Sequence, residues 1–303
     1  MATATLPTAP DPDPDPDLDP EGFVAAIAAR GRRVDTPCGD GTMAWRVWGE
    51  GPPLVVGHGA QGAWSHWIRN IGELSRHRTV IAVDLPGHGD SASPARQDHR
   101  AIAAALAQGL LIVTGSDAPV DFAGFSFSGT AFAHFAAWYP QCVRRLILIG
   151  CGGLDTPNGH VDLGPVRGLE GDARAARLKA NLLGLMLHAD ETVDPLAMHL
   201  LVVNARQARF GAAAADMVLP DKLIRILPEL RCQVDAIWGE HDRPHPDPAV
   251  QETALRTVDP DLDFRVIAGG GHWVMYERPQ AFNAALLDML AQPLRSAKAA
   301  GGA

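Results

Sequence analysis

Three side chains whose types could together perform nucleophilic catalysis follow three separate apolar runs of the sequence. Ser126 lies in the segment 124–129, Asp242 follows a run that ends at Trp238, and His272 follows three consecutive glycines. A hydroxyl attacks a carbonyl readily when an imidazole accepts its proton and a carboxylate orients that imidazole. The sequence therefore predicts a nucleophile, an orienting acid and a general base, in that order along the chain.

The segment Gly124-Phe125-Ser126-Phe127-Ser128-Gly129 is close to the G-x-S-x-G pattern of a strand–turn–helix elbow. Ser128 stands where the second glycine is usual, and Gly129 comes one place later. The sharp turn requires small residues two positions on either side of the nucleophile. Ser128 as nucleophile would place Thr130 at such a position, so Ser126 is the preferred nucleophile and Ser128 the alternative. A serine at this position could also be an ordinary helix N-cap without a catalytic role. Suitable acid and base residues after the other strands would argue against that explanation.

The acid and the base each have an alternative explanation. Glu240 is the second candidate for the acid. Several metal-ligand types also surround Asp242, but three prolines at alternate positions interrupt the helical pairing that metal-binding histidines use, so we predict no metal. The glycines before His272 predict a flexible loop that swings the imidazole over the sheet edge. The residues of this metal-like cluster are His241, Asp242, His245 and Asp247, with Pro244, Pro246 and Pro248.

Two further loops follow apolar runs. Gly57-His58-Gly59-Ala60 contains small residues that let the backbone approach a reacting oxygen, and the Ala60 and Phe127 N–H groups are our candidate oxyanion donors. We expect His58 to shape this loop rather than to act in catalysis. The turn from Asp84 to Ser91 contains Pro and Gly, and we expect its charged groups to be structural.

Short β-branched runs alternate with helical stretches over most of the chain, which predicts an α/β fold with a mostly parallel sheet and helices on both faces. An alternating strand, Thr42–Trp48, precedes them, and the stretch 152–230 contains no convincing strand, so we expect it to form a helical cap above the sheet edge. The predicted strands are 54–56, 79–83, 120–123, 146–149, 234–238 and 264–267. The predicted helices are 21–29, 96–113, 129–139, 173–187, 195–210, 221–227 and 279–290.

Composition excludes several classes of protein. The chain has 303 residues, 47% hydrophobic and 20% charged, as in globular proteins, and a formal net charge of −9. Six of these negative charges lie in residues 1–21, where residues 1–20 form a Pro/Asp-rich stretch that we expect to be disordered.

A nucleic-acid or membrane partner is not expected. Four scattered cysteines indicate a reducing, cytoplasmic location. We expect core segments at 21–151 and 231–303.

Over about residues 30–292 the quoted motifs resemble the α/β-hydrolase superfamily, in its serine-nucleophile branch with a helical cap. The resemblance implies an eight-stranded, mostly parallel sheet with the cap after strand six, and a Ser126–Asp242–His272 triad that needs no cofactor. A serine at the elbow argues against the branches with a carboxylate nucleophile. The segment around Trp273 resembles the branch that hydrolyses carbon–carbon bonds in ring-cleavage products of aromatics, where a cap arginine binds a carboxylate. Arg206 and Arg209 are our candidates for that arginine.

Against that branch, Phe125 stands where asparagine is usual before the nucleophile. An apolar, aromatic-lined pocket is instead suggested by Phe125, Phe127, Trp64 and Trp67. Our candidate substrate-binding aromatics are Trp64, Phe125 and Trp273. Our first prediction is a hydrolase of small, largely apolar carboxylic esters. The alternatives are a carbon–carbon hydrolase acting on a dienol-keto acid and a non-catalytic relative that binds a small ligand. The partner is in each case a small molecule, and the sequence leaves a homo-oligomer open.

Overall fold

The computed structural model describes residues 19–94, 96–210 and 216–295. Most of the predicted Pro/Asp-rich tail, residues 1–18, lies outside the described residues. Pro20 is the first residue of the helix α1 (Pro20–Ala29), and Asp19 caps that helix, because its carboxylate accepts a hydrogen bond of 2.7 Å from the Gly22 N–H. The helix therefore begins one residue before the predicted core segment.

Eight strands form one sheet in the order β1-β2-β4-β3-β5-β6-β7-β8. The first two pairs, β1 with β2 and β2 with β4, are antiparallel, and all the others are parallel. The predicted eight-stranded, mostly parallel sheet is thus confirmed. The strands are β1 (Arg32–Cys38), β2 (Gly41–Trp48), β3 (Pro53–Gly57), β4 (Thr79–Val83), β5 (Val120–Phe125), β6 (Val143–Ile149), β7 (Gln233–Gly239) and β8 (Phe264–Ile267).

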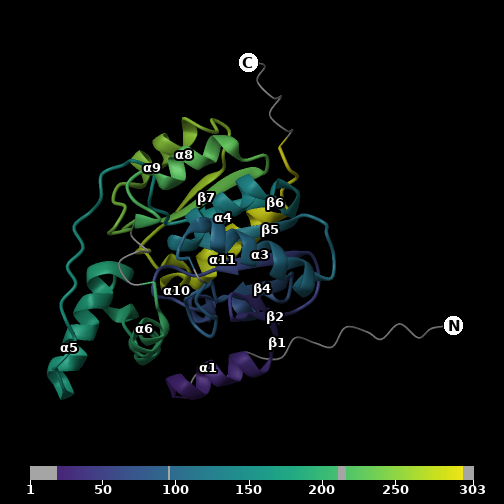
Figure 1. The fold of residues 1–303 in the computed structure, drawn as a ribbon. Coiled ribbons are helices and arrows are strands. Elements are labelled where there is room, and N and C mark those ends of the chain that lie inside the picture. The colour runs from purple at the N-terminus through teal and green to yellow at the C-terminus, as the bar shows by residue number, and fades with distance from the viewer. Residues whose placement is uncertain (1–18, 95, 211–215, 296–303) are drawn as a thin grey trace.

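Alternate side chains of the central strands pack into two separate cores, one on each face of the sheet. In β3, for example, Val55 belongs to one core, whereas Leu54 and Val56 belong to the other. Helices supply the opposing apolar surfaces, so the strands are buried on both faces (Figure 1). One face carries α3 (His99–Thr114), α4 (Phe127–Trp138), α8 (Lys222–Ile226) and α9 (Pro248–Arg256); the other carries α1, α2 (Ile71–Leu74), α10 (Val274–Glu277) and α11 (Pro279–Ala291).

The described residues between β6 and β7 form helices and loops without a strand. Two helices, α5 (Gly171–Asn181) and α6 (Pro195–Gln207), stand at one side of the sheet in Figure 1, and a π-helical turn (Leu182–Met186) follows α5 directly. The third predicted cap helix, α8, differs: Leu223 and Ile226 are buried in the same core as α4. Part of the predicted cap therefore packs on the core face.

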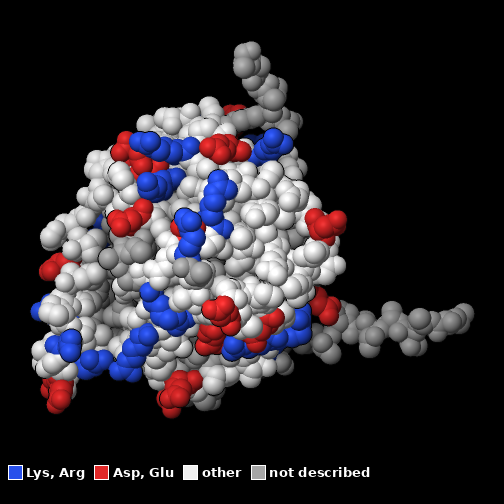
Figure 2. Space-filling view, in the orientation of Figure 1, with Lys and Arg blue, Asp and Glu red and all other residues white. Residues whose placement is uncertain are grey.

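Among the described strands and α-helices, four were not predicted: strand β1 and the helices α2, α9 and α10. Strand β1 was missed because its outer positions are polar and only Thr36 and Cys38 are buried, as expected at a sheet edge. Helix α9 was not predicted because a proline-rich loop precedes it and Pro248 is its first residue. Acidic and basic side chains are interspersed on the face shown in Figure 2. Among the described residues, no helix is long and apolar enough to cross a membrane.

Candidate active site

The nucleophile elbow connects β5 to α4. Ser126 has φ = +51°, a left-handed conformation that is strained for serine, and its N–H donates to the Ile149 carbonyl of β6 at 2.8 Å. A side chain at Gly124 would meet the Cα of Gly129 at 2.6 Å. The tight contact across the turn therefore involves the glycine that follows Ser128, which explains the shifted pattern in the sequence.

Ser128 is fully buried, and its hydroxyl donates to the Phe125 carbonyl at 3.0 Å. Space for its Cβ is available because Gly57, which faces it, has no side chain. Ser126 is instead partly exposed, and its Oγ lies 3.2 Å from His272 Nε2. Of the two candidate serines, the structure brings only Ser126 to the candidate base.

The acid and the base meet from neighbouring strand ends. His272 Nδ1 lies 2.9 Å from Asp242 Oδ2, and both residues are almost fully buried. This bond places the imidazole proton on Nδ1, which leaves Nε2 free to accept the Ser126 proton. The three predicted residues thus form one continuous hydrogen-bonded chain.

The loop before His272 is pinned rather than free to swing, contrary to the sequence-based expectation. The His241 N–H donates to the Gly270 carbonyl at 2.8 Å, and the Gly271 N–H donates to Glu277 at 2.6 Å. Gly150, after β6, has φ = +52°, and a Cβ there would lie 2.8 Å from Asp242 Oδ2. Here the glycines allow close backbone packing, which holds the imidazole in place.

Glu240 lies apart from the imidazole: its carboxylate accepts from the Gly269 N–H at 2.8 Å and half of its side chain is exposed. The residues of the predicted metal-like cluster do not all come together, because His241 stacks on His188 and Asp247 caps α9. The chosen acid, Asp242, is therefore the carboxylate that reaches His272.

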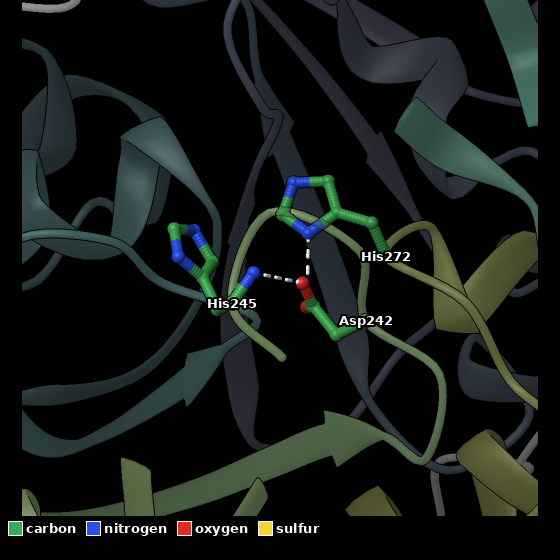
Figure 3. Close-up of side chains that lie close together, drawn as sticks. All are labelled: Asp242, His245 and His272. Atoms are coloured by element: carbon green, nitrogen blue, oxygen red, sulfur yellow. Dashed lines mark hydrogen bonds and ion pairs between the residues drawn. The ribbon is translucent and has the colours of Figure 1, made fainter. Parts of the chain in front are cut away.

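Among the described residues, Asp242, His245 and His272 form the one group whose ligand-type atoms lie within 4.8 Å of one another. Figure 3 shows the His245 ring directed away from the carboxylate, while its backbone N–H donates to Asp242 Oδ1 at 3.0 Å. Burial lowers the pKa of His245 to about 4. Both carboxylate oxygens already accept protein hydrogen bonds, an arrangement suited to orienting His272 rather than to binding a cation.

Of the candidate oxyanion donors, Phe127 is the first residue of α4, directly after Ser126, and Ala60 lies in the loop after β3. Within the described residues, neither the Ala60 nor the Phe127 N–H has a protein acceptor. His58 shapes the first loop, since its Nδ1 donates to the Gly59 carbonyl at 2.8 Å and its Nε2 accepts from the Leu85 N–H at 3.0 Å. Burial lowers the pKa of His58 to about 4, so the ring is neutral at pH 7.

The turn after β4 has the structural role expected of it. The buried Asp84 carboxylate accepts from the N–H groups of Trp64 at 2.7 Å and Asp90 at 3.1 Å, and burial raises its pKa. It thereby joins the turn to the segment that follows the oxyanion loop.

Aromatic rings and neutral imidazoles surround the triad. The Phe125 ring lies 4.9 Å from that of His272, and the His66 ring lies between Phe125 and Trp273, at 5.7 Å and 4.8 Å. His66 was missed in the sequence because nothing there distinguishes it from the other eleven histidines. Its Nδ1 accepts from the Gly59 N–H at 3.3 Å, and burial lowers its pKa well below the usual value.

Three predicted substrate contacts have other partners. The Trp64 ring packs against Trp48 at 5.5 Å and beneath the guanidinium of Arg46 at 4.9 Å. The Arg209 guanidinium donates to backbone carbonyls that include Ser91, in the turn after β4. Arg206 lines a separate hollow of about 740 Å³ between α1 and α6. Within the described residues, neither arginine has a hydrogen bond or ion pair with Ser126, Asp242 or His272.

Comparison with known proteins identifies the family. Residues 54–285 match the model of the alpha/beta hydrolase family. A 2-hydroxy-6-oxononadienedioate/2-hydroxy-6-oxononatrienedioate hydrolase from Paraburkholderia phymatum is 30% identical, over 85% of this chain and 90% of that protein. A 2-hydroxy-6-oxo-2,4-heptadienoate hydrolase from Pseudomonas putida is 29% identical, over 80% and 90%.

Among solved structures, an esterase from Rhodococcus sp. ECU1013 superposes with a TM-score of 0.71 at 22% identity, over 86% of this chain and 98% of that one. The naproxen esterase of Bacillus subtilis gives a TM-score of 0.73 at 19% identity, over 89% and 95%. At these identities the likeness shows the fold alone. Together with the family match over most of the chain, it makes this protein an enzyme of the alpha/beta hydrolase family.

Proposed function

We propose that the protein is a serine hydrolase that cleaves small, largely apolar carboxylic esters through an acyl-enzyme. The observation that carries the proposal is the chain of hydrogen bonds from Asp242 through His272 to Ser126. His272 Nε2 accepts the Ser126 proton as Oγ attacks the ester carbonyl, and the imidazolium then protonates the leaving alcohol. Asp242 stabilises that imidazolium.

The Ala60 and Phe127 N–H groups are the proposed donors to the oxyanion, and each such donor typically contributes about 3 kcal/mol to transition-state stabilisation. A water molecule, deprotonated by His272, attacks the acyl-enzyme and releases the acid and the free serine. The chemistry is complete with these side chains and backbone groups, and it needs no cofactor.

The surroundings of the triad support an apolar acyl substrate. Phe125 and Trp273 are buried beside the triad, and His66 is neutral there. Of the two predicted arginines, Arg209 is engaged by backbone carbonyls, and Arg206 lines a hollow between α1 and α6. All four cysteines are free, which supports a reducing compartment, for which we propose the cytoplasm.

Carbon–carbon bond hydrolysis is the second candidate, and the relatives favour it. The curated relatives described above are named as hydrolases of 2-hydroxy-6-oxo dienoic acids. The same triad would serve, with water added across a carbon–carbon bond next to the keto group. That reaction also calls for a cation that binds the substrate carboxylate. In the part of the chain that the structure describes, neither Arg206 nor Arg209 has a hydrogen bond or ion pair with the triad.

Parallel kinetics on a short-chain aryl ester and on 2-hydroxy-6-oxo-2,4-heptadienoate test the proposal. We expect a larger kcat/KM for the ester, and loss of both activities by at least about 1,000-fold in Ser126→Ala. Ser128→Ala is the matched control and should retain activity. Rapid bleaching of the dienoate beside a near-background ester rate would reverse the ranking, and an active Ser126→Ala variant would refute the mechanism.

A further inference from the structure

The proposed mechanism does not use Glu277, a buried carboxylate five residues after His272 in the sequence. Glu277, the last residue of α10, is 4% exposed. Its Oε1 accepts from the N–H groups of His188 at 2.9 Å and Ala189 at 2.8 Å. It also lies 2.8 Å from the Thr192 hydroxyl oxygen, whose proton has a second acceptor in the Ala189 carbonyl at 2.6 Å. Its Oε2 accepts from the Gly271 N–H at 2.6 Å and again from His188 at 3.1 Å.

These donors come from two distant parts of the chain. Two belong to the segment 188–192, which follows the π-helical turn of the cap, and the third is the residue directly before His272. Within the described residues no cation pairs with Glu277, so neutral donors alone compensate its charge. The carboxylate therefore joins the cap to the loop that carries the base.

A second hydrogen bond ties the other side of His272 to the same part of the cap. The Trp273 N–H donates to the Met186 carbonyl, in the π-helical turn, at 2.7 Å. The residues before and after His272 are thus both attached to the cap, one through Glu277 and one directly. Turns of this kind are frequent at functional sites, where they direct a backbone group out of the regular helical pattern.

We propose that Glu277 is a positioning residue that keeps His272 within reach of Ser126 by joining the histidine loop to the cap. The inference rests on the proposed function. Its physical basis is the narrow geometry of the reaction: the His272 Nε2 to Ser126 Oγ distance is 3.2 Å, and a misplacement of about 1 Å costs about 100-fold in rate. A glutamine cannot replace the glutamate, because its amide N–H₂ would face N–H donors.

Glu277→Gln is the direct test, with Glu240→Gln as its matched control. Glu240 also accepts an N–H from the histidine loop, from Gly269 at 2.8 Å, but its side chain is half exposed, and its partners Gly269 and His241 lie outside the cap. The readouts are kcat and KM for a short aryl ester, the rate of Ser126 labelling by a fluorophosphonate, and thermal melting. Labelling reports the reactivity of Ser126 independently of turnover.

We expect Glu277→Gln to lower kcat by about 10- to 100-fold with KM within about threefold, and to slow labelling by a similar factor. Glu240→Gln should stay within about twofold of the wild type in both. A folded Glu277→Gln variant with kcat and labelling within about twofold of the wild type would overturn the inference.

If Glu277→Gln does not fold, Glu277→Asp provides the test, because it keeps the carboxylate but shortens the side chain, so that the carboxylate can no longer reach both the cap N–H groups and the Gly271 N–H. Its expected effect is a two- to fivefold fall, roughly, in both kcat and labelling, and unchanged values would overturn the inference. Wild-type enzyme in which Ser126 is not labelled at all would instead refute the proposed function, so the two failures are distinguishable.

Discussion

Gly150 provides a sharp steric test of the candidate site. A Cβ at this position would lie 2.8 Å from Asp242 Oδ2 and 3.3 Å from His272 Nδ1, whereas ordinary contacts begin at 3.4 Å. The carboxylate would have to retreat by about 0.6 Å, and the imidazole bonded to it would move as well. Since about 1 Å of misplacement costs about 100-fold, we expect Gly150→Ala to lower kcat/KM by about 10- to 100-fold, or about 1.4 to 2.7 kcal/mol.

The substitution has a second effect that must be separated from the first. Gly150 has φ = +52°, and an alanine in the left-handed region costs about 1–2 kcal/mol of stability. Gly115→Ala is the matched control, because Gly115 has φ = +64° at the end of α3 and no atom within 4 Å of the added Cβ. It should lower the melting temperature similarly and leave the ester kcat/KM unchanged.

The assay is steady-state hydrolysis of a short aryl ester by both variants, at a temperature where thermal melts show both to be folded. The steric reasoning is refuted if Gly150→Ala keeps kcat/KM within about twofold of Gly115→Ala. Equal losses in the two variants would show that backbone strain, and not the displaced carboxylate, is responsible.

Three further predictions concern stability. Ser128→Ala removes one buried hydrogen bond and should lower the free energy of unfolding by about 1 kcal/mol in urea titrations; no change would contradict the role given to this hydroxyl. The buried Asp121 accepts from Arg78 at 3.0 Å and also from Arg144, so Asp121→Asn should lower that free energy by about 3 kcal/mol, and a loss below about 1 kcal/mol would be inconsistent with these two ion pairs. Burial lowers the pKa of His58 to about 4, whereas its value in the unfolded chain is about 6.5. Between about pH 6.5 and about pH 4 the unfolded chain therefore binds a proton that the folded chain does not. The free energy of unfolding should fall by about 3 kcal/mol as the pH is lowered through this range. Urea titrations at several pH values measure this loss, and an equally steep decline in His58→Asn would assign it to other groups.

The parallel part of the fold could be predicted from the sequence because its strands are buried on both faces. Runs such as Thr79–Val83 and Leu146–Ile149 are continuous and β-branched or aliphatic, and this pattern requires little context. Strand β1 gave no such signal, since an edge strand exposes polar side chains. The sequence did not show that α8 packs in the same core as α4, because an amphipathic helix does not reveal which apolar surface its buried face will meet.

The chain order of Ser126, Asp242 and His272 and their places after apolar runs were visible in the sequence, since the carboxyl ends of parallel strands meet at one edge of a sheet. Only the tertiary structure decided what surrounds them. It showed that Arg209 is engaged by a turn, that His66 lies beside the oxyanion loop, and that Glu277 joins the cap to the histidine loop. Long polar side chains can bond to any segment that folding brings near, so their partners depend on how distant parts of the chain pack. The strand-end positions of the triad depend on local pattern and topology, and for that reason the sequence alone was sufficient to predict them.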